Sequence, residues 1–161
     1  MKTFSTIAKP MRDAYDRHYR DHCGPALRFL MQTSGVDEVL LGNIVGGLAG
    51  ATVYCHLLSA RSGWWDNAEP EDPATFATKI ALIHSEVSEA LEGGRKGLPD
   101  DHLPHRSAEE VEMADILIRV FDLAGARKLD LAGALIEKLA YNQLRADHKR
   151  ENRAALGGKK F

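Results

Sequence analysis

The sequence predicts an all-α protein, an antiparallel bundle of helices, and two observations lead to this prediction. No segment alternates apolar and polar residues for long, whereas several segments repeat apolar residues at helical spacing. The prolines also lie outside these periodic segments, at Pro10, Pro25, Pro70, Pro73, Pro99 and Pro104. Short loops between successive helices favour antiparallel neighbours and hence a bundle.

Size and charge limit the possible classes of function. The chain has 161 residues, enough for one domain or one domain with an arm. Its 21 Lys and Arg against 23 Asp and Glu give a net charge of −2. Because it lacks the basic field of a general nucleic-acid binder, we expect no nucleic-acid polymer as a partner. Cys23 and Cys55 make no disulfide framework, and no signal-peptide pattern opens the chain, so we expect a cytoplasmic protein.

The chain is expected to divide into three segments. Residues 1–62 form an N-terminal helical extension that packs on the core and begins with a helix through Tyr15 and Tyr19. Residues 63–153 form the helical core, and residues 154–161 form a flexible tail.

One stretch of the extension, residues 39–60, has the length of a membrane-spanning helix. It carries no Asp, Glu, Lys or Arg. However, Asn43, Thr52 and His56 interrupt it, and its glycines dilute its hydrophobicity. We therefore expect no membrane contact but a buried helix whose glycines allow another helix to approach closely.

The first two core helices have recognisable ends. Asp72 is a candidate N-cap, with Pro73 at the first helical position. The Gly-Gly pair at residues 93–94 is expected to end this helix. Ser107 followed by Glu110 forms a capping box that opens the next helix. Apolar stripes on both helices are expected to pack inward, namely Ile80, Ile83, Val87 and Ala90 on the first and Val111, Ala114, Leu117, Ile118 and Phe121 on the second.

Beside each stripe, acidic residues repeat every three positions. They are Glu86, Glu89 and Glu92 on the first helix and Glu109, Glu112 and Asp115 on the second. We consider Glu86, Glu89, Glu112 and Asp115 with the residues three and four positions away on the same helix. Among these four acids, only Asp115 has a basic neighbour, Arg119. Two carboxylates about 5 Å apart repel by roughly 3 kcal/mol at an effective dielectric near 20. A surface benefit of about 0.5 kcal/mol does not offset that repulsion.

Two arrangements of these acidic lines are open from their spacing alone. If the lines face each other, a divalent cation would relieve the repulsion, and an all-oxygen ligand set suits Mg²⁺ or Mn²⁺ rather than zinc. If both lines point to water, ions screen the repulsion and no cation is needed.

The acidic residues carry a resemblance to a known family. Glu86-Val87-Ser88-Glu89, then 22 residues, then Glu112-Met113-Ala114-Asp115, resembles the ExxE…ExxD signature of the all-alpha nucleoside triphosphate pyrophosphohydrolases, the MazG-like group. The resemblance covers roughly residues 63–152. The chain departs from many members at Ser85, where they have a further glutamate, and its first 60 or so residues match nothing in the family pattern.

This resemblance implies a fold, an activity and a metal site. The fold would be the helical bundle of the all-alpha NTP pyrophosphatases with an N-terminal extension. Glu86, Glu89, Glu112 and Asp115 would ligate Mg²⁺, or Mn²⁺ in its place. Glu89 would orient or deprotonate the water that attacks the α-phosphorus of a (d)NTP, giving a nucleoside monophosphate and pyrophosphate.

The last long helix, from an N-cap at Asp130 to about Asn152, supplies candidate substrate ligands. Lys138, Asn142 and Arg145 continue, at i, i+4 and i+7, a stripe that begins apolar. The resemblance implies that Lys138 and Arg145 neutralise phosphate charge and that Asn142 bonds sugar or phosphate. The alternative is a solvated end of an amphipathic helix.

Two smaller features have competing interpretations. Trp64 and Trp65 lie together in a loop, and the resemblance implies that one of them stacks on the base of a nucleotide. The alternative is that both close the end of the bundle. His18 and His22, with Cys23 beside them, have the spacing of a metal pair, but no further convincing ligand lies nearby, so we assign them no role.

We also expect self-association, as a homodimer or homotetramer. The helix that starts at Ser107 carries Met113, Ile116 and Val120 on the side away from its main stripe, so it needs cover on more than one side. Two other functions stay open: a non-catalytic helical interaction or oligomerisation protein of the same fold, and a phosphoribosyl-nucleotide pyrophosphatase.

Overall fold

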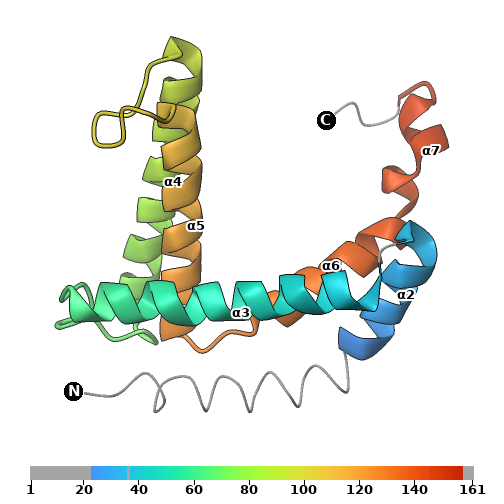
Figure 1. Cartoon of the computed structure of the whole chain (residues 1–161), viewed down its shortest axis with the longest axis horizontal. Helices are drawn as coiled ribbons and strands as arrows, with labels where there is room; N and C mark the ends of the chain where they lie inside the picture. The colour runs from blue at the N-terminus through green and yellow to red at the C-terminus, as the bar shows by residue number, and fades with distance from the viewer. Residues whose placement is uncertain (1–22, 36, 158–161) are drawn as a thin grey trace. The chain divides into compact units, whose positions relative to one another are not determined.

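The computed structural model describes residues 23–35 and 37–157. Within these residues the protein is helical and contains no strand, which confirms the predicted all-α class (Figure 1). The predicted helix through Tyr15 and Tyr19 lies outside the described residues, as do His18 and His22.

Internal contacts divide the described chain into two compact units. The first holds the residues up to Gly50 together with those from Asp130 onward, and the second holds Ala51–Leu129. These limits differ from the predicted boundary between residues 62 and 63, because the last long helix packs on an early helix in the first unit.

The first unit is built around α2 (Gly24–Ser34) and α6 (Leu131–Leu144), which pack against each other. The predicted N-cap is confirmed, since the Asp130 side chain accepts from the backbone N–H of Gly133. The helix is shorter than predicted, because Arg145 adopts an extended backbone; a 3-10 turn (Ala146–His148) and α7 (Arg150–Ala154) follow. The buried core of the first unit consists of Leu27, Leu30, Leu41, Val45, Ala132, Ile136 and Ala140.

The long helix α3 (Glu38–Arg61) contributes its first half to this unit and its second half to the other. Among the described residues, Val39–Arg61 is the one stretch long and apolar enough to span a membrane. The core helix of a soluble protein meets the same criterion, so this finding places the chain in no compartment.

The prediction that this helix is buried holds for one side of it only. Leu41 and Val45 are buried, whereas Val39 is 73% exposed and Tyr54 is 58% exposed. A Cβ atom added at Gly42 or Gly46 would meet no atom of the described residues within 4 Å. A helix does approach closely in the second unit, at Gly125, where an added Cβ would lie 2.5 Å from the Cβ of His56 on α3.

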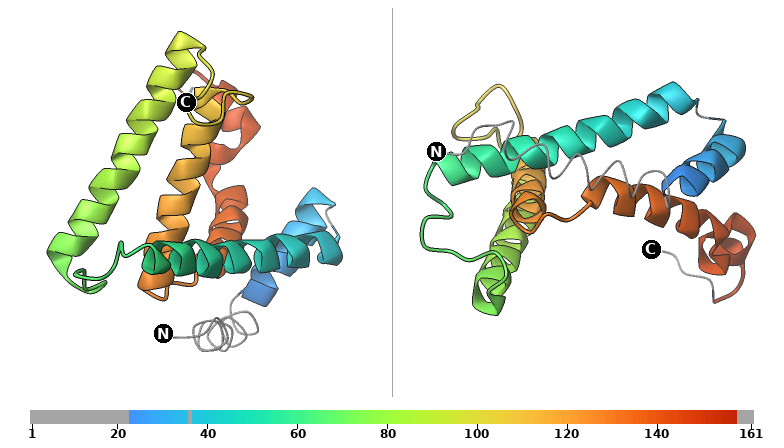
Figure 2. Two further views of the ribbon diagram at one scale, coloured as in Figure 1. Left: turned by 60° about the vertical axis from the view of Figure 1, so that its left-hand side comes forward. Right: turned by 90° about the horizontal axis from the view of Figure 1, so that it is seen from below.

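The second unit contains α4 (Pro73–Lys96) and α5 (Ala108–Ala126), which pack against each other in antiparallel directions (Figures 1 and 2). Both predicted N-caps are confirmed: the Asp72 side chain accepts from the N–H of Thr75, and that of Ser107 accepts from the N–H of Glu110. Helix α4 continues past residues 93–94 and ends at Gly97, whose φ of 62° is left-handed.

Gly93 has a different role from the one predicted, because it lies inside α4. A Cβ atom at this position would lie 2.9 Å from the backbone nitrogen of Glu109 and 3.0 Å from the Cβ of Ala108. The glycine therefore allows the first turn of α5 to approach the last turns of α4.

The predicted inward stripes are only partly buried. Ala90 is buried, but Val87 is 48% exposed, Leu117 is 54% exposed and Ile118 is 45% exposed. Glu86, by contrast, is only 6% exposed. The rotation of the two helices about their axes thus brings part of the acidic lines, and not the whole apolar stripes, to the contact between α4 and α5.

Candidate metal centre

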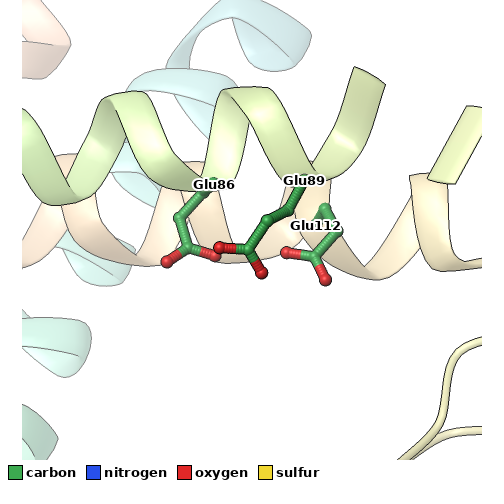
Figure 3. A group of neighbouring side chains, drawn as sticks. All are labelled: Glu86, Glu89 and Glu112. Atoms are coloured by element: carbon green, nitrogen blue, oxygen red, sulfur yellow. The ribbon is translucent and has the colours of Figure 1, made fainter. Parts of the chain in front are cut away.

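Three of the predicted metal ligands come together in the second unit. Glu86 and Glu89 project from α4 and Glu112 projects from α5, and one carboxylate oxygen of each lies within 4.8 Å of the others. Figure 3 shows the three carboxylates side by side on one edge of the helix pair. Of the two arrangements left open by the sequence, the structure has the one in which acids from both helices converge.

The electrostatic cost of this convergence appears at Glu112. Burial, followed by a hydrogen bond to Glu86 and the negative charge of Glu89, raises the pKa of Glu112 to about 6. Below about pH 6, a proton on this side chain therefore partly relieves the repulsion. A bound cation would relieve the same repulsion by replacing that proton.

Asp115, the fourth predicted ligand, lies beside the three glutamates but is not one of the mutually close group. Burial raises its pKa, and the charge of Glu86 raises it further, while Arg119 lowers it. Asp115 is therefore electrostatically coupled to the cluster.

Arg119 is the partner that the sequence analysis missed. Its Nε lies 2.6 Å and its Nη2 lies 2.5 Å from Oε1 of Glu86, on the opposite helix. The Glu86 side chain is 7% exposed and that of Arg119 is 35% exposed. The expectation that Glu86 lacks a basic partner is wrong, because only neighbours on the same helix were compared. The sequence does contain a sign of this ion pair, because Arg119 lies four residues after Asp115 and so continues the acidic line on the same helix.

Two further acidic residues near the cluster have structural partners. Glu92, the last acid of its line, is half-exposed and pairs with Arg95 at 3.5 Å and Lys96 at 3.0 Å. Asp100, in the loop between α4 and α5, is buried and accepts hydrogen bonds from the backbone N–H groups of His102 and Leu103. These contacts account for both carboxylates without a cation.

The predicted substrate ligands Lys138, Asn142 and Arg145 lie in the first unit. Arg145 is bound by Asp147, with Nε 2.9 Å and Nη2 2.6 Å from its two carboxylate oxygens. The Nζ of Lys138 lies 4.8 Å from the ring centroid of Tyr141. Because these residues and the carboxylates belong to different units, their sharing of one site stays a prediction.

Asn142 has the one feature of this group that points to a ligand. Its Oδ1 atom is buried and has no hydrogen-bond partner within the described part of the chain. Leaving such an acceptor unsatisfied costs about 1–3 kcal/mol, and a ligand hydroxyl or N–H group would satisfy it.

The two tryptophans have different surroundings. Trp64 is 64% exposed. Trp65 donates from Nε1 to Oδ1 of Asp122 at 2.8 Å, and the Nζ of Lys79 lies 4.1 Å from its ring centroid. Its ring and that of His56 form a T-shaped pair, with centroids 5.6 Å apart. Trp65 is thus engaged within the second unit, whereas the Trp64 side chain is largely exposed.

The predicted site residues therefore occupy both units, with the ExxE…ExxD acids on α4 and α5 and with Lys138 and Asn142 on α6. Glu86, Glu89 and Glu112 form a group that could hold a metal ion, and Asn142 has an unsatisfied acceptor. In comparisons with family models, curated proteins and solved structures, the chain shows no match.

Proposed function

We propose that this protein is a Mg²⁺-dependent nucleotide pyrophosphohydrolase that cleaves a (d)NTP between the α and β phosphates. The observation that carries the proposal is the convergence of the Glu86, Glu89 and Glu112 carboxylates, with oxygens within 4.8 Å of one another. Their positions match the ExxE…ExxD signature, and the α4–α5 pair supports a bundle of the all-alpha NTP pyrophosphatase type.

The donor set fits a hard divalent cation. All candidate ligands are carboxylate oxygens, which Mg²⁺ and Mn²⁺ prefer, and Asp115 is electrostatically coupled to Glu86 of the group. A bound Mg²⁺ would neutralise phosphate charge and increase the acidity of a water molecule.

Glu89 is the residue best placed to handle the proton of the attacking water. It is the exposed member of the cluster, whereas Glu86 is buried and bonded to Arg119. We assign to Glu89 the role of accepting that proton as the water oxygen bonds to the α-phosphorus. The bond from the α-phosphorus to the bridging oxygen breaks, and its electron pair leaves with pyrophosphate.

Residues of α6 are proposed to hold the rest of the nucleotide. Asn142, with its unsatisfied Oδ1, would accept a hydrogen bond from the sugar, and Lys138 would neutralise a phosphate. Arg145 would have to leave Asp147 to do the same. Trp64, which is exposed, is the better candidate of the two tryptophans for stacking on the base.

Self-association is part of the proposal. The exposed apolar side chains of the α4–α5 pair would be covered by a second copy of the chain in a homodimer or homotetramer. They are Val87, Leu91, Met113, Leu117 and Ile118.

A substrate panel tests this function. The full chain is incubated with individual dNTPs and NTPs and Mg²⁺, and pyrophosphate is resolved from orthophosphate. We expect pyrophosphate release that E89Q lowers at least about 100-fold, since general-base catalysis contributes about 10²–10⁴-fold. The control is E92Q on the same helix, whose carboxylate is paired with Arg95 and Lys96.

Other results would support the rival functions. Release only from a phosphoribosyl-nucleotide would favour that substrate class. No release together with no stabilisation by Mg²⁺ would contradict the proposal and favour a non-catalytic interaction protein.

A further inference from the structure

We infer that Arg119 is a phosphate-binding residue of this site, held in place by Glu86 and presenting its remaining N–H groups to the substrate. The inference rests on the proposed function, because it concerns the same carboxylate cluster. It assigns to Arg119 a role that the motif acids do not supply.

The geometry of the ion pair leaves part of the guanidinium available. Nε and Nη2 of Arg119 both contact one oxygen of Glu86, Oε1. Among the described residues, Nη1 of Arg119 has no hydrogen-bond partner, and the side chain is 35% exposed. An arginine has five N–H donors in a planar fork, so one edge can hold a carboxylate while the other binds a phosphate oxygen.

The ion pair also leaves the second carboxylate oxygen of Glu86 for other partners. Oε1 is the atom that accepts from Arg119, and Oε2 is not used by that contact. Glu86 can therefore keep Arg119 in place and still offer an oxygen to a cation shared with Glu89 and Glu112.

The charge around the cluster calls for such a residue. Glu86, Glu89, Glu112 and Asp115 together carry more negative charge than one divalent cation neutralises, and a triphosphate adds further negative charge. A cationic side chain at the cluster reduces this repulsion.

Arg119 is the residue that meets this need within the α4–α5 pair. It is the one Lys or Arg in the sequence of α5. On α4, the side chains of Lys79, Arg95 and Lys96 contact Trp65 or Glu92. Among these basic residues of the α4–α5 pair, Arg119 is the one that contacts a carboxylate of the acidic cluster, that of Glu86.

Two titrations on the full chain test this inference. Mn²⁺ alone is titrated first, and inorganic pyrophosphate is then titrated into the Mn²⁺-loaded protein, with both dissociation constants measured by calorimetry. The variants are R119Q and R119K, and the control is R106Q. R106Q removes the same charge from an exposed pair with Glu110 in the same unit.

We expect R119Q to weaken pyrophosphate binding about tenfold or more while the Mn²⁺ dissociation constant stays within about threefold of wild type. R106Q should change neither constant by more than about threefold. R119K keeps the charge but loses the planar fork, so we expect it to weaken pyrophosphate binding at least about threefold. If R119Q fails to fold, as judged by circular dichroism, R119K decides the matter.

Unchanged pyrophosphate affinity in R119Q, or in R119K where it is the deciding variant, would overturn the inference alone. So would a parallel loss of Mn²⁺ affinity, which would show that Arg119 only holds Glu86 in place. Failure of the wild-type chain to bind Mn²⁺ would overturn the proposed function itself.

Discussion

The indole Nε1 of Trp65 donates a 2.8 Å hydrogen bond to Oδ1 of Asp122, and Nδ1 of His56 lies 3.0 Å from the same oxygen. Asp122 is 7% exposed. This single carboxylate connects the loop before α4 to the end of α5 and to α3. All of these residues lie within the second unit.

We expect D122A to lower the free energy of unfolding by about 2–4 kcal/mol. The substitution leaves the indole N–H and the imidazole without their acceptor in a poorly hydrated environment. Urea denaturation followed by circular dichroism measures the loss. The control is E110A, which removes an exposed ion pair with Arg106 and should cost no more than about 1 kcal/mol. A D122A protein as stable as E110A would contradict the structural role of Asp122.

G93A should destabilise the α4–α5 pair by about 1–3 kcal/mol. The new Cβ would lie 2.9 Å from the Glu109 backbone nitrogen, so one helix must shift. Because the acidic cluster spans these helices, Mn²⁺ binding should also weaken. The measurements are thermal unfolding and a Mn²⁺ titration.

The matched control for G93A is G46A on α3. A Cβ atom at Gly46 meets nothing within 4 Å among the described residues, and alanine favours a helix over glycine by about 1 kcal/mol. G46A should therefore be neutral or stabilising. Equal destabilisation by both variants would contradict the contact assigned to Gly93.

The raised pKa of Glu112 predicts a pH dependence of stability in the absence of metal. Its pKa is about 6 in the folded protein against 4.5 as the reference value, so the folded state holds the proton more tightly. Stability should therefore fall as pH rises from about 4.5 to about 6, by about 1 kcal/mol after allowance for solvent screening.

E112Q should remove this decline, because a neutral amide has no proton to lose. Melting temperatures of wild type and E112Q, measured between pH 4 and 7.5, test the prediction. Added Mg²⁺ should stabilise wild type above pH 6, where the carboxylate is ionised, and should stabilise E112Q less. Identical pH profiles of the two proteins without metal would contradict the assignment to Glu112.

L117E should weaken self-association by at least about 2 kcal/mol, because Leu117 is 54% exposed on the apolar surface that we propose is covered by a second copy. Light scattering coupled to size-exclusion chromatography measures the change in mass. The control is L156E, an exposed leucine near the end of the described chain, which should leave the mass unchanged. A wild-type chain that is monomeric at high concentration would contradict the proposed cover.

Much of the local structure was predictable because it depends on residues three or four positions apart. The side chains of Asp72, Ser107 and Asp130 accept hydrogen bonds from backbone N–H groups three residues later, as their sequence contexts predict. The spacing of Glu86 and Glu89 on one helix placed these carboxylates on one line for the same reason.

The remaining features depend on how each helix is rotated about its axis and which partner it meets. The Arg119–Glu86 ion pair joins two helices, and Asp122 gathers Trp65 and His56 from distant parts of the chain. The exposure of Leu117 and the burial of Glu86 likewise follow from the rotation of α5 and α4 about their axes.

The sequence by itself thus determined the helical class, the helix starts and the acidic lines, since these are set by hydrogen bonds and spacing within one or two turns. The tertiary structure alone decided that acids from two helices converge and that Arg119 neutralises one of them. Such contacts form between side chains far apart in the sequence, and only the packing of α4 against α5 brings them within bonding distance.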